Sequence, residues 1–210
     1  MVSPRPAAGV VTAVMMPTVD GKPARRGRPR SAETEHVILE SAYRIMASQG
    51  LAAASIDAIA RDCGVSKMTI YKWWPSREAL LIDAFLRQAA SMLPLPETGD
   101  PLARMRKHAA AYVKALNGDF GKVQLAVIAE CIAGTGSAKI FSERYLAIRR
   151  DVAIQIIKAG QRDDSIVASE SAGDLYDRIY GTLFYQYVFG FRALTKGYAE
   201  QLVMTVLARK

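Results

Sequence analysis

The stretch Ser55-Ile-Asp-Ala-Ile-Ala-Arg-Asp-Cys-Gly-Val-Ser-Lys-Met-Thr-Ile-Tyr-Lys-Trp-Trp74 determines the fold of the N-terminal part of the chain. Ser55 and Ser66 each stand directly before an amphipathic run, which is the position of a helix N-cap. Gly64 lies between the two runs and permits the left-handed residue of a sharp turn. Ala60 is small enough to let two helices approach closely. This spacing predicts a helix-turn-helix over residues 55–74.

The second helix of this motif has a polar and basic outward face. Val65 and Ile70 are placed to pin it against the first helix, while the segment from Gly64 to Arg77 contains three bases and no acid. Such a helix fits the major groove of duplex DNA. The alternative is a plain surface helix in which Tyr71 is half-buried packing. The predicted DNA-contacting residues are Ser66, Lys67, Thr69, Tyr71, Lys72, Trp73 and Arg77.

Helical periodicity continues on both sides of the motif. A first helix follows Ser31 and ends at Gly50, Trp74 closes a three-helix unit, and a fourth helix runs from Arg77 to Met92. Proline and glycine residues between 94 and 101 mark a boundary. Further helices are expected at 102–117, 120–133, 137–160, 171–190 and 196–208. Strand alternation is absent, so we predict an all-α fold with an arm (1–30), a DNA-binding domain (31–91) and a second helical domain (92–210).

Positive charge is concentrated in the N-terminal arm. The chain has 210 residues and a formal net charge of +8, and residues 1–30 hold six bases against one acid. The segment from Lys22 to Arg30 resembles the Gly-Arg-Pro core of minor-groove AT-hooks, with Arg26, Arg28 and Arg30 as predicted DNA contacts. The alternative is a solvated tail that only raises non-specific affinity. We expect the arm to be disordered.

Several functional classes are not supported by the sequence. Cys63 and Cys131 lie in apolar helical patterns, as expected for core residues of a protein in a reducing compartment. His36 and His108 have no partners at metal-ligand spacing, and no catalytic residue set or phosphate loop is recognisable. No apolar run approaches the roughly 20 residues of a membrane span. We therefore expect a cytoplasmic protein that is not an enzyme and has no cofactor or metal.

The motif resembles the DNA-binding domain of the TetR family of regulators. The resemblance is carried by Gly64-Val65-Ser66-Lys67, Thr69-Ile70-Tyr71 and Pro75-Ser76-Arg77-Glu78-Ala79-Leu80-Leu81, after Ile38-Leu39 and Gly50. It covers about Ser31 to Phe85, with Trp73-Trp74 and Cys63 as mild departures. It implies a homodimer that binds a DNA operator through an N-terminal three-helix domain. It also implies that residues 92–210 dimerise and bind an effector.

The resemblance further implies that the last two helices form a four-helix dimer interface. The segment from Asp174 to Gly190, followed by Leu194-Thr195, is similar to one C-terminal type of the family. The apolar residues expected at this interface are Leu175, Ile179, Leu183 and Tyr187 on one helix and Tyr198, Leu202, Val206 and Leu207 on the other.

An effector pocket between the inner helices of the second domain is the remaining prediction. The leading hypothesis is a repressor released by a small hydrophobic or aromatic effector. An architectural DNA-binding protein with a solid C-terminal core is the alternative, and a cavity above roughly 300 Å³ distinguishes the two. Activator and repressor are not distinguished by the sequence. The predicted pocket residues are Met105, His108, Tyr112, Gln124, Phe141, Tyr145, Tyr180 and Phe184.

Overall fold

Apolar side chains spaced three and four residues apart make the chain helical. The computed structural model describes residues 32–133, 142–167 and 169–208, without the side chains of Arg144 and Tyr145. No strand occurs in these ranges, and the all-α prediction is confirmed. The elements are α1 (Ala32–Gln49), η1 (Leu51–Ala53), α2 (Ile56–Cys63), α3 (Lys67–Trp73), α4 (Arg77–Met92), α5 (Pro101–Leu116), α6 (Asp119–Ala133), η2 (Ser142–Ala147), α8 (Ile148–Arg162), α9 (Ala172–Phe189) and α10 (Lys196–Leu207).

Local signals in the sequence set most helix boundaries. Gly50 follows α1 with a φ of 87°, a left-handed value that glycine adopts without steric cost. Ser76 Oγ accepts a hydrogen bond from Ala79 N at 3.2 Å and begins α4. Thr195 Oγ1 does the same for α10, from Tyr198 N at 3.1 Å. These side chains satisfy backbone donors that the first helical turn leaves unpaired.

The helix predicted over 137–160 differs from the structure. η2 is a π-helical turn, and α8 follows it and continues to Arg162. A π-helical turn shifts the residues after it relative to a regular α-helix, so the inward face of α8 was not readable from one continuous period. The first part of the predicted helix, 137–141, lies outside the described residues.

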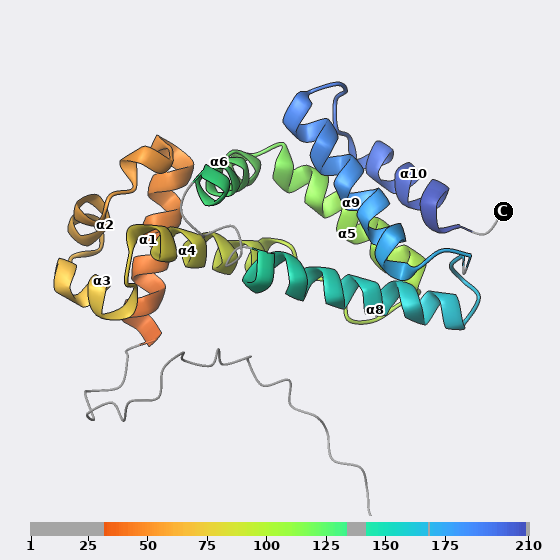
Figure 1. Cartoon of the computed structure of the whole chain (residues 1–210), viewed down its shortest axis with the longest axis horizontal. Helices are drawn as coiled ribbons and strands as arrows, with labels where there is room; N and C mark the ends of the chain where they lie inside the picture. Colours follow the sequence, from red (N-terminus) through yellow and green to blue (C-terminus); the bar gives the residue numbers. More distant parts are fainter. Residues whose placement is uncertain (1–31, 134–141, 168, 209–210) are drawn as a thin grey trace, which may run out of the picture. The chain divides into compact units, whose positions relative to one another are not determined.

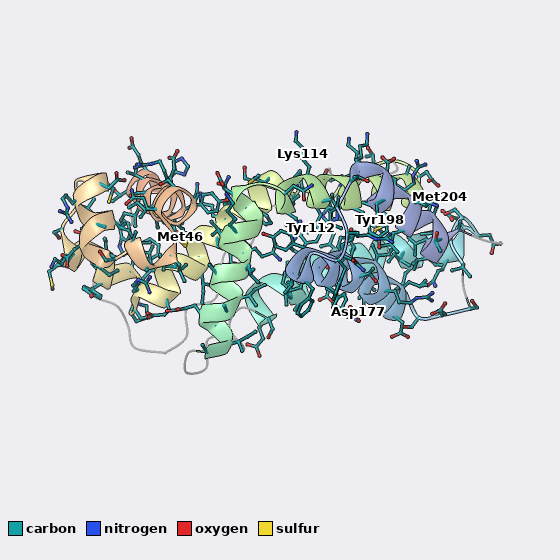
Figure 2. All side chains as sticks on the ribbon, turned by 90° about the horizontal axis from the view of Figure 1, so that it is seen from above. Met46, Tyr112, Lys114, Asp177, Tyr198 and Met204 are labelled. Carbon is teal, nitrogen blue, oxygen red and sulfur yellow. The ribbon has the colours of Figure 1, made fainter. Side chains whose placement is uncertain are left out.

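The helices of residues 32–210 form one compact unit in which two groups can be distinguished. α1 to α4 pack together, and α5, α8, α9 and α10 pack together, while α6 contacts α1 and α4 as well as α5 (Figure 1). In the view of Figure 2, Met46 lies among the helices of the first group and Tyr112 within the second. Both side chains are buried in one continuous apolar core. A division into domains at residue 91 stays a prediction.

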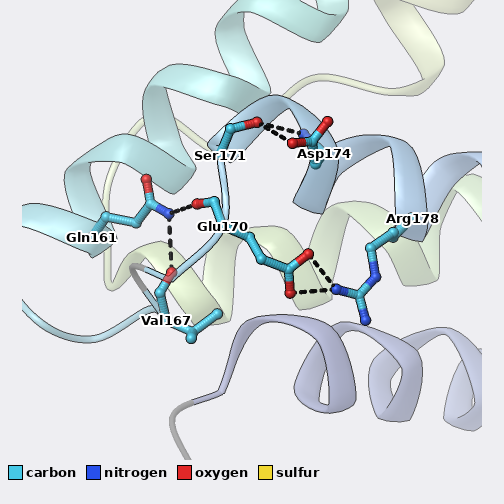
Figure 3. A network of polar contacts seen from close by, with 6 residues as sticks. All are labelled: Gln161, Val167, Glu170, Ser171, Asp174 and Arg178. Atoms are coloured by element: carbon cyan, nitrogen blue, oxygen red, sulfur yellow. Dashed lines mark hydrogen bonds and ion pairs between the residues drawn. The ribbon is translucent and has the colours of Figure 1, made fainter.

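The connection from α8 to α9 is fixed by polar contacts (Figure 3). Gln161 Nε2 donates to the carbonyl oxygens of Val167 and Glu170, each at 2.9 Å. Ser171 Oγ accepts from Asp174 N at 3.1 Å and caps α9. These bonds hold the start of α9, the helix that contributes most residues to the cavity described below.

Five of the eight apolar residues predicted for a dimer interface are instead packed inside the chain. Of the predicted residues, Leu175, Ile179, Leu183, Val206 and Leu207 are buried, and Tyr187, Tyr198 and Leu202 are half-buried against the same core. For the five buried residues the prediction is wrong, because helical periodicity identifies an apolar face but not the surface that covers it. For the half-buried Tyr187, Tyr198 and Leu202 an interface role stays a prediction. The large apolar side chains exposed on α9, on α10 and in the turn between them are Tyr185, Phe189, Phe191 and Met204.

Candidate nucleic-acid interface and cavity

α2, α3 and the turn between them form the predicted helix-turn-helix. Ser55 Oγ accepts from Ala58 N at 3.1 Å, and Ser66 Oγ accepts from Thr69 N at 3.1 Å. Gly64 has φ 67° and ψ 25°, the left-handed conformation that the turn requires. Both predicted caps and the predicted glycine turn are therefore confirmed.

The outward face of α3 carries the predicted DNA-contacting residues. Tyr71 is 49% exposed, and Lys67 and Lys72 are exposed as well. Thr69 is half-buried, and its Oγ1 lies 2.9 Å from Ser66 Oγ. The structure thus brings these residues together on one surface that is open to a large partner.

Met68 is a residue that the sequence reasoning left out of the site. Its side chain is 77% exposed, more than any other large apolar side chain among the described residues. It stands three residues before Tyr71 and four before Lys72 on α3, and this spacing places it on the same helix face. Apolar side chains in the major groove contact the methyl group of thymine. Met68 therefore belongs to the candidate interface.

Lys67 has a partner within the protein. Its Nζ forms an ion pair with Asp57 on α2, and both side chains are more than half exposed. An exposed pair of this kind contributes about 0–1 kcal/mol to stability. Since the pair is weak, a phosphate group can replace the Asp57 carboxylate at little cost.

Arg77, a predicted phosphate contact, has hydrogen-bond partners within the protein. Its Nε donates to Ala54 O at 3.0 Å and its Nη2 to Leu51 O at 2.5 Å, both at the η1 turn. Its Nη1 lies 3.5 Å from Glu130 Oε1 on α6. The guanidinium therefore fixes the start of α4 against η1, and a phosphate contact by Arg77 stays a prediction. Sequence spacing located the cation but gave no information on these carbonyl groups.

The two tryptophans close the three-helix unit. Trp74 is buried, as predicted, and its Nε1 donates to Asp83 Oδ2 on α4 at 2.9 Å. Trp73 is half-buried and meets Trp74 edge to face, with ring centroids 5.7 Å apart. Trp73 thus presents only part of its ring to a DNA partner.

The predicted arm contacts Arg26, Arg28 and Arg30 lie outside the described residues.

A cavity of about 390 Å³ lies between α5, α6, α8 and α9, and it is open to solvent where exposed residues such as Ile132 and Leu146 line it. Five of the predicted pocket residues line it: His108, Tyr112, Gln124, Tyr180 and Phe184. Met105 is fully buried in the core and does not line the cavity, so its prediction is wrong. The predicted Phe141 and the side chain of Tyr145 lie outside the described residues.

Other lining residues were missed by the sequence reasoning. Among them are Cys131, Arg149, Arg150, Tyr176 and Asp177. Tyr176 stands four residues before Tyr180, and this spacing could have placed it on the same helix face. No comparable signal exists for the two arginines, because the packing of α8 against α5 and α9 is a long-range feature.

A second, larger hollow of about 590 Å³ lies between α5 and α10, and exposed lysines line it.

The polar groups of the cavity form a connected network around His108. Burial, and then the nearby charge of Arg149, lower the pKa of this imidazole to about 3, so it is neutral. Arg149 Nη2 lies 3.1 Å from His108 Nε2, and a guanidinium only donates. Nε2 is therefore the acceptor, and Nδ1–H donates to Tyr180 Oη at 2.5 Å.

Arg149 also connects the cavity wall to α4. Its Nη1 donates to Ala89 O at 3.3 Å and its Nη2 to Leu93 O at 2.5 Å. Leu93 follows the last residue of α4, and its N–H bonds to Ala89 O. A residue that lines the cavity is thus bonded to the C-terminal end of the helix that begins beside the helix-turn-helix.

Two negative findings apply to the described part of the chain. No group of three or more metal-ligating side chains occurs there. Among the helices described, none is both long and apolar enough to cross a membrane.

The helix-turn-helix and its exposed, partly basic face define a DNA-binding regulator, and comparisons give the family. Residues 38–84 match the family model for bacterial regulatory proteins of the tetR family, and residues 95–206 match the tetracyclin repressor-like C-terminal domain. The chain belongs to the TetR family of transcriptional regulators. In this family, regulators bind DNA operators and small-molecule effectors.

Individual relatives agree with this assignment. The HTH-type transcriptional regulator YdeS of Bacillus subtilis is 31% identical over 181 residues, which cover 86% of this chain and 91% of YdeS. The structure of the TetR family regulator SCO0332 is similar with a TM-score of 0.72 and 23% identity, over 83% of this chain and 96% of the other. A regulator from Saccharomonospora viridis in complex with choline has a TM-score of 0.63 and 21% identity, over 86% and 100%.

Proposed function

We propose that this TetR-family regulator is a repressor that a small hydrophobic or aromatic effector releases from its operator. The observation that carries the proposal is the bond between the cavity and α4, in which Arg149 holds the carbonyl oxygens of Ala89 and Leu93. α4 begins at Arg77, three residues after Trp74, which is the C-cap of α3. A molecule that displaces Arg149 would change the position of α4 and with it the orientation of the reading helix.

The bonds of Arg149 are strong enough to account for an allosteric coupling energy of ordinary size. Hydrogen bonds to a charged group contribute about 1.5–3 kcal/mol, and allosteric coupling energies are about 1–3 kcal/mol. The loss of one Arg149 bond is therefore enough for an effector response. The cavity volume of about 390 Å³ exceeds the roughly 300 Å³ that we set as the limit for a solid, architectural core.

The proposed assembly is a homodimer that uses the outer side of α9 and α10. Tyr185, Phe189 and Phe191 are 51%, 60% and 67% exposed, and their rings contact one another with centroids 4.9–5.9 Å apart. A contiguous exposed aromatic patch indicates an interaction site. Two copies are also needed to read operator half-sites about 34–36 Å apart.

The proposed DNA contacts are made by α3 and by the arm. Met68, Thr69, Tyr71 and Lys72 would reach base edges or phosphates, and Ser66, Lys67 and Trp73 would contribute at the margin of the surface. The arginines of residues 1–30 would add contacts in the minor groove. We further propose that the protein catalyses no reaction and acts in the cytoplasm, where its operator is.

The test combines operator selection with a filled cavity. Sequences bound from random DNA give an operator, and compounds that weaken its binding give an effector. Ile128→Trp places a larger side chain in the cavity wall, whereas Leu125→Trp makes a similar change on the outer side of the same helix. We expect the first variant to bind operator without an effector response and the second to respond normally. An unchanged response in Ile128→Trp would contradict the proposed site.

A further inference from the structure

The wall of the cavity is aromatic on one side. Tyr176 and Tyr180 are stacked with ring centroids 4.5 Å apart, and Tyr112 meets Tyr180 at 5.8 Å. Phe184 follows on the next turn of α9. Rings prefer to stack with other rings in offset or edge-to-face geometry. The shape and chemistry of this side therefore favour a flat aromatic occupant.

The charges of the wall disfavour an ionic occupant. Asp177 is the acid among the described lining residues, and Arg150 binds it through two bonds of 3.0 and 2.6 Å. A cation would therefore meet two arginines and a carboxylate that is already paired. An anion would have to take Arg149 from the carbonyl groups and the imidazole that it now bonds, or compete with Asp177 for Arg150. Burying a charge without a new partner is costly.

Gln124 supplies an acceptor within this otherwise paired wall. Its side chain is 3% exposed and lines the cavity. Its Nε2 donates to Tyr112 Oη at 3.0 Å, and its Oε1 has no hydrogen-bond partner among the described residues. Buried carbonyl groups are nearly always paired, because an unpaired one loses the hydrogen bonds it makes with water. A ligand that donates to Oε1 would remove this penalty.

We propose that the cavity binds an uncharged, planar aromatic molecule with one O–H or N–H donor, which bonds Gln124 Oε1. The inference rests on the proposed function, because it names the chemical class of the effector that would occupy the same cavity. A volume of about 390 Å³ lies at the small end of ligand pockets and suits a molecule of about two fused rings.

Three probes of one shape test the ligand class on the full chain without DNA. 2-Naphthol has the aromatic body and the donor, 2-methoxynaphthalene lacks the donor, and 2-naphthoate carries a negative charge. Calorimetric titration gives each dissociation constant. We expect 2-naphthol to bind about tenfold more tightly than the ether, which corresponds to about 1.4 kcal/mol, and more tightly than the acid. Equal or tighter binding of the ether or the acid would overturn the proposal, as would the absence of binding by all three.

Two matched variants locate the acceptor. Gln124→Leu removes the amide from the cavity wall, whereas Gln186→Leu removes another buried amide oxygen without a partner, from a residue that does not line the cavity. The first should weaken 2-naphthol binding about tenfold and abolish its advantage over the ether. Gln186→Leu should change neither the affinity for 2-naphthol nor its advantage over the ether. If Gln124→Leu does not fold, the comparison of the probes on the unaltered chain decides the proposal.

The outcome for the proposed function is read separately, by operator release. Tight binding of 2-naphthol without any release supports the ligand class and counts against the effector switch. Release by a compound of another class, with no binding of 2-naphthol, supports the switch and overturns the ligand class.

Discussion

Acidification should destabilise this protein through His108, at pH values where carboxylates of ordinary pKa are still ionised. The pKa of this imidazole falls from 6.5 to about 3 on folding, mainly because the ring is buried. The unfolded chain therefore binds a proton at mildly acidic pH that the folded chain does not bind. Stability rises with pH wherever the unfolded state binds more protons, so it falls as the pH is lowered from 6.5 toward 3.

The size of the effect follows from these two pKa values. At pH 5, about 1.5 units below the pKa of 6.5, protonation of this imidazole stabilises the unfolded chain. The folded chain stays unprotonated there and gains almost nothing. The free energy of unfolding should therefore drop by about 2 kcal/mol. Since pH 5 is well above the pKa in the folded protein, this figure depends mainly on the value of 6.5 in the unfolded chain.

Urea unfolding at several pH values between 7.5 and 5, followed by tryptophan fluorescence, measures the effect. His108→Gln removes the titrating group and should flatten the pH dependence, although it also lowers stability at every pH by altering the contacts to Tyr180 and Arg149. His36→Gln is the matched control, because His36 is the other histidine of the chain and its side chain is 51% exposed. The same slope in His108→Gln as in the unaltered chain would refute the argument.

Three further perturbations test the DNA-binding surface, the arm and the dimer. Lys72→Ala and Tyr71→Phe should each weaken operator binding in a gel-shift titration and leave the melting temperature unchanged, because both side chains are exposed. Deletion of residues 1–30 should reduce affinity and flatten the dependence of log affinity on log salt by about 0.9 per lost phosphate contact, with a larger loss on sites flanked by A·T tracts if the arm enters the minor groove. Tyr185→Glu should shift the chain from dimer to monomer in sedimentation, because it would bury an unpaired charge in the proposed interface.

Each of these has its own control. Lys107→Ala removes an exposed lysine of α5 and should leave operator affinity unchanged. Leu125→Glu adds a charge at an apolar residue of α6 that is 37% exposed and should leave the dimer intact. Normal affinity of the α3 variants, an unaltered salt slope without the arm, or a dimeric Tyr185→Glu variant would each contradict the corresponding proposal.

The sequence predicted the features whose causes are local. Ser55 and Ser66 cap their helices, and Gly64 adopts the left-handed turn, because each acts within four residues along the chain. The same reasoning located most helices of the second half to within two residues. These features depend on hydrogen bonds inside one turn, so neighbouring residues contain enough information.

Features that depend on the packing of distant helices were predicted only in part. Periodicity predicts five cavity residues on α5, α6 and α9, namely His108, Tyr112, Gln124, Tyr180 and Phe184. It does not predict Arg149 and Arg150, since their role depends on where α8 packs. The sequence predicts a phosphate contact for Arg77 but contains no sign of the two carbonyl groups at η1 that accept its hydrogen bonds. Periodicity gives the direction of a side chain around its helix, and tertiary structure decides what it meets.

Both ends of α4 are held in the same manner, which determines how a change in the cavity can reach the DNA-binding surface. Arg77 bonds the η1 carbonyl groups at one end, and Arg149 bonds those of Ala89 and Leu93 at the other. A second path runs through α6, where Glu130 lies 3.5 Å from Arg77 and next to the cavity residue Cys131. The Glu130 pair is partly exposed and contributes about 0–1 kcal/mol, whereas each bond of Arg149 contributes about 1.5–3 kcal/mol. The path through Arg149 should therefore dominate, and substitution of Glu130 should change the effector response less than substitution of Arg149.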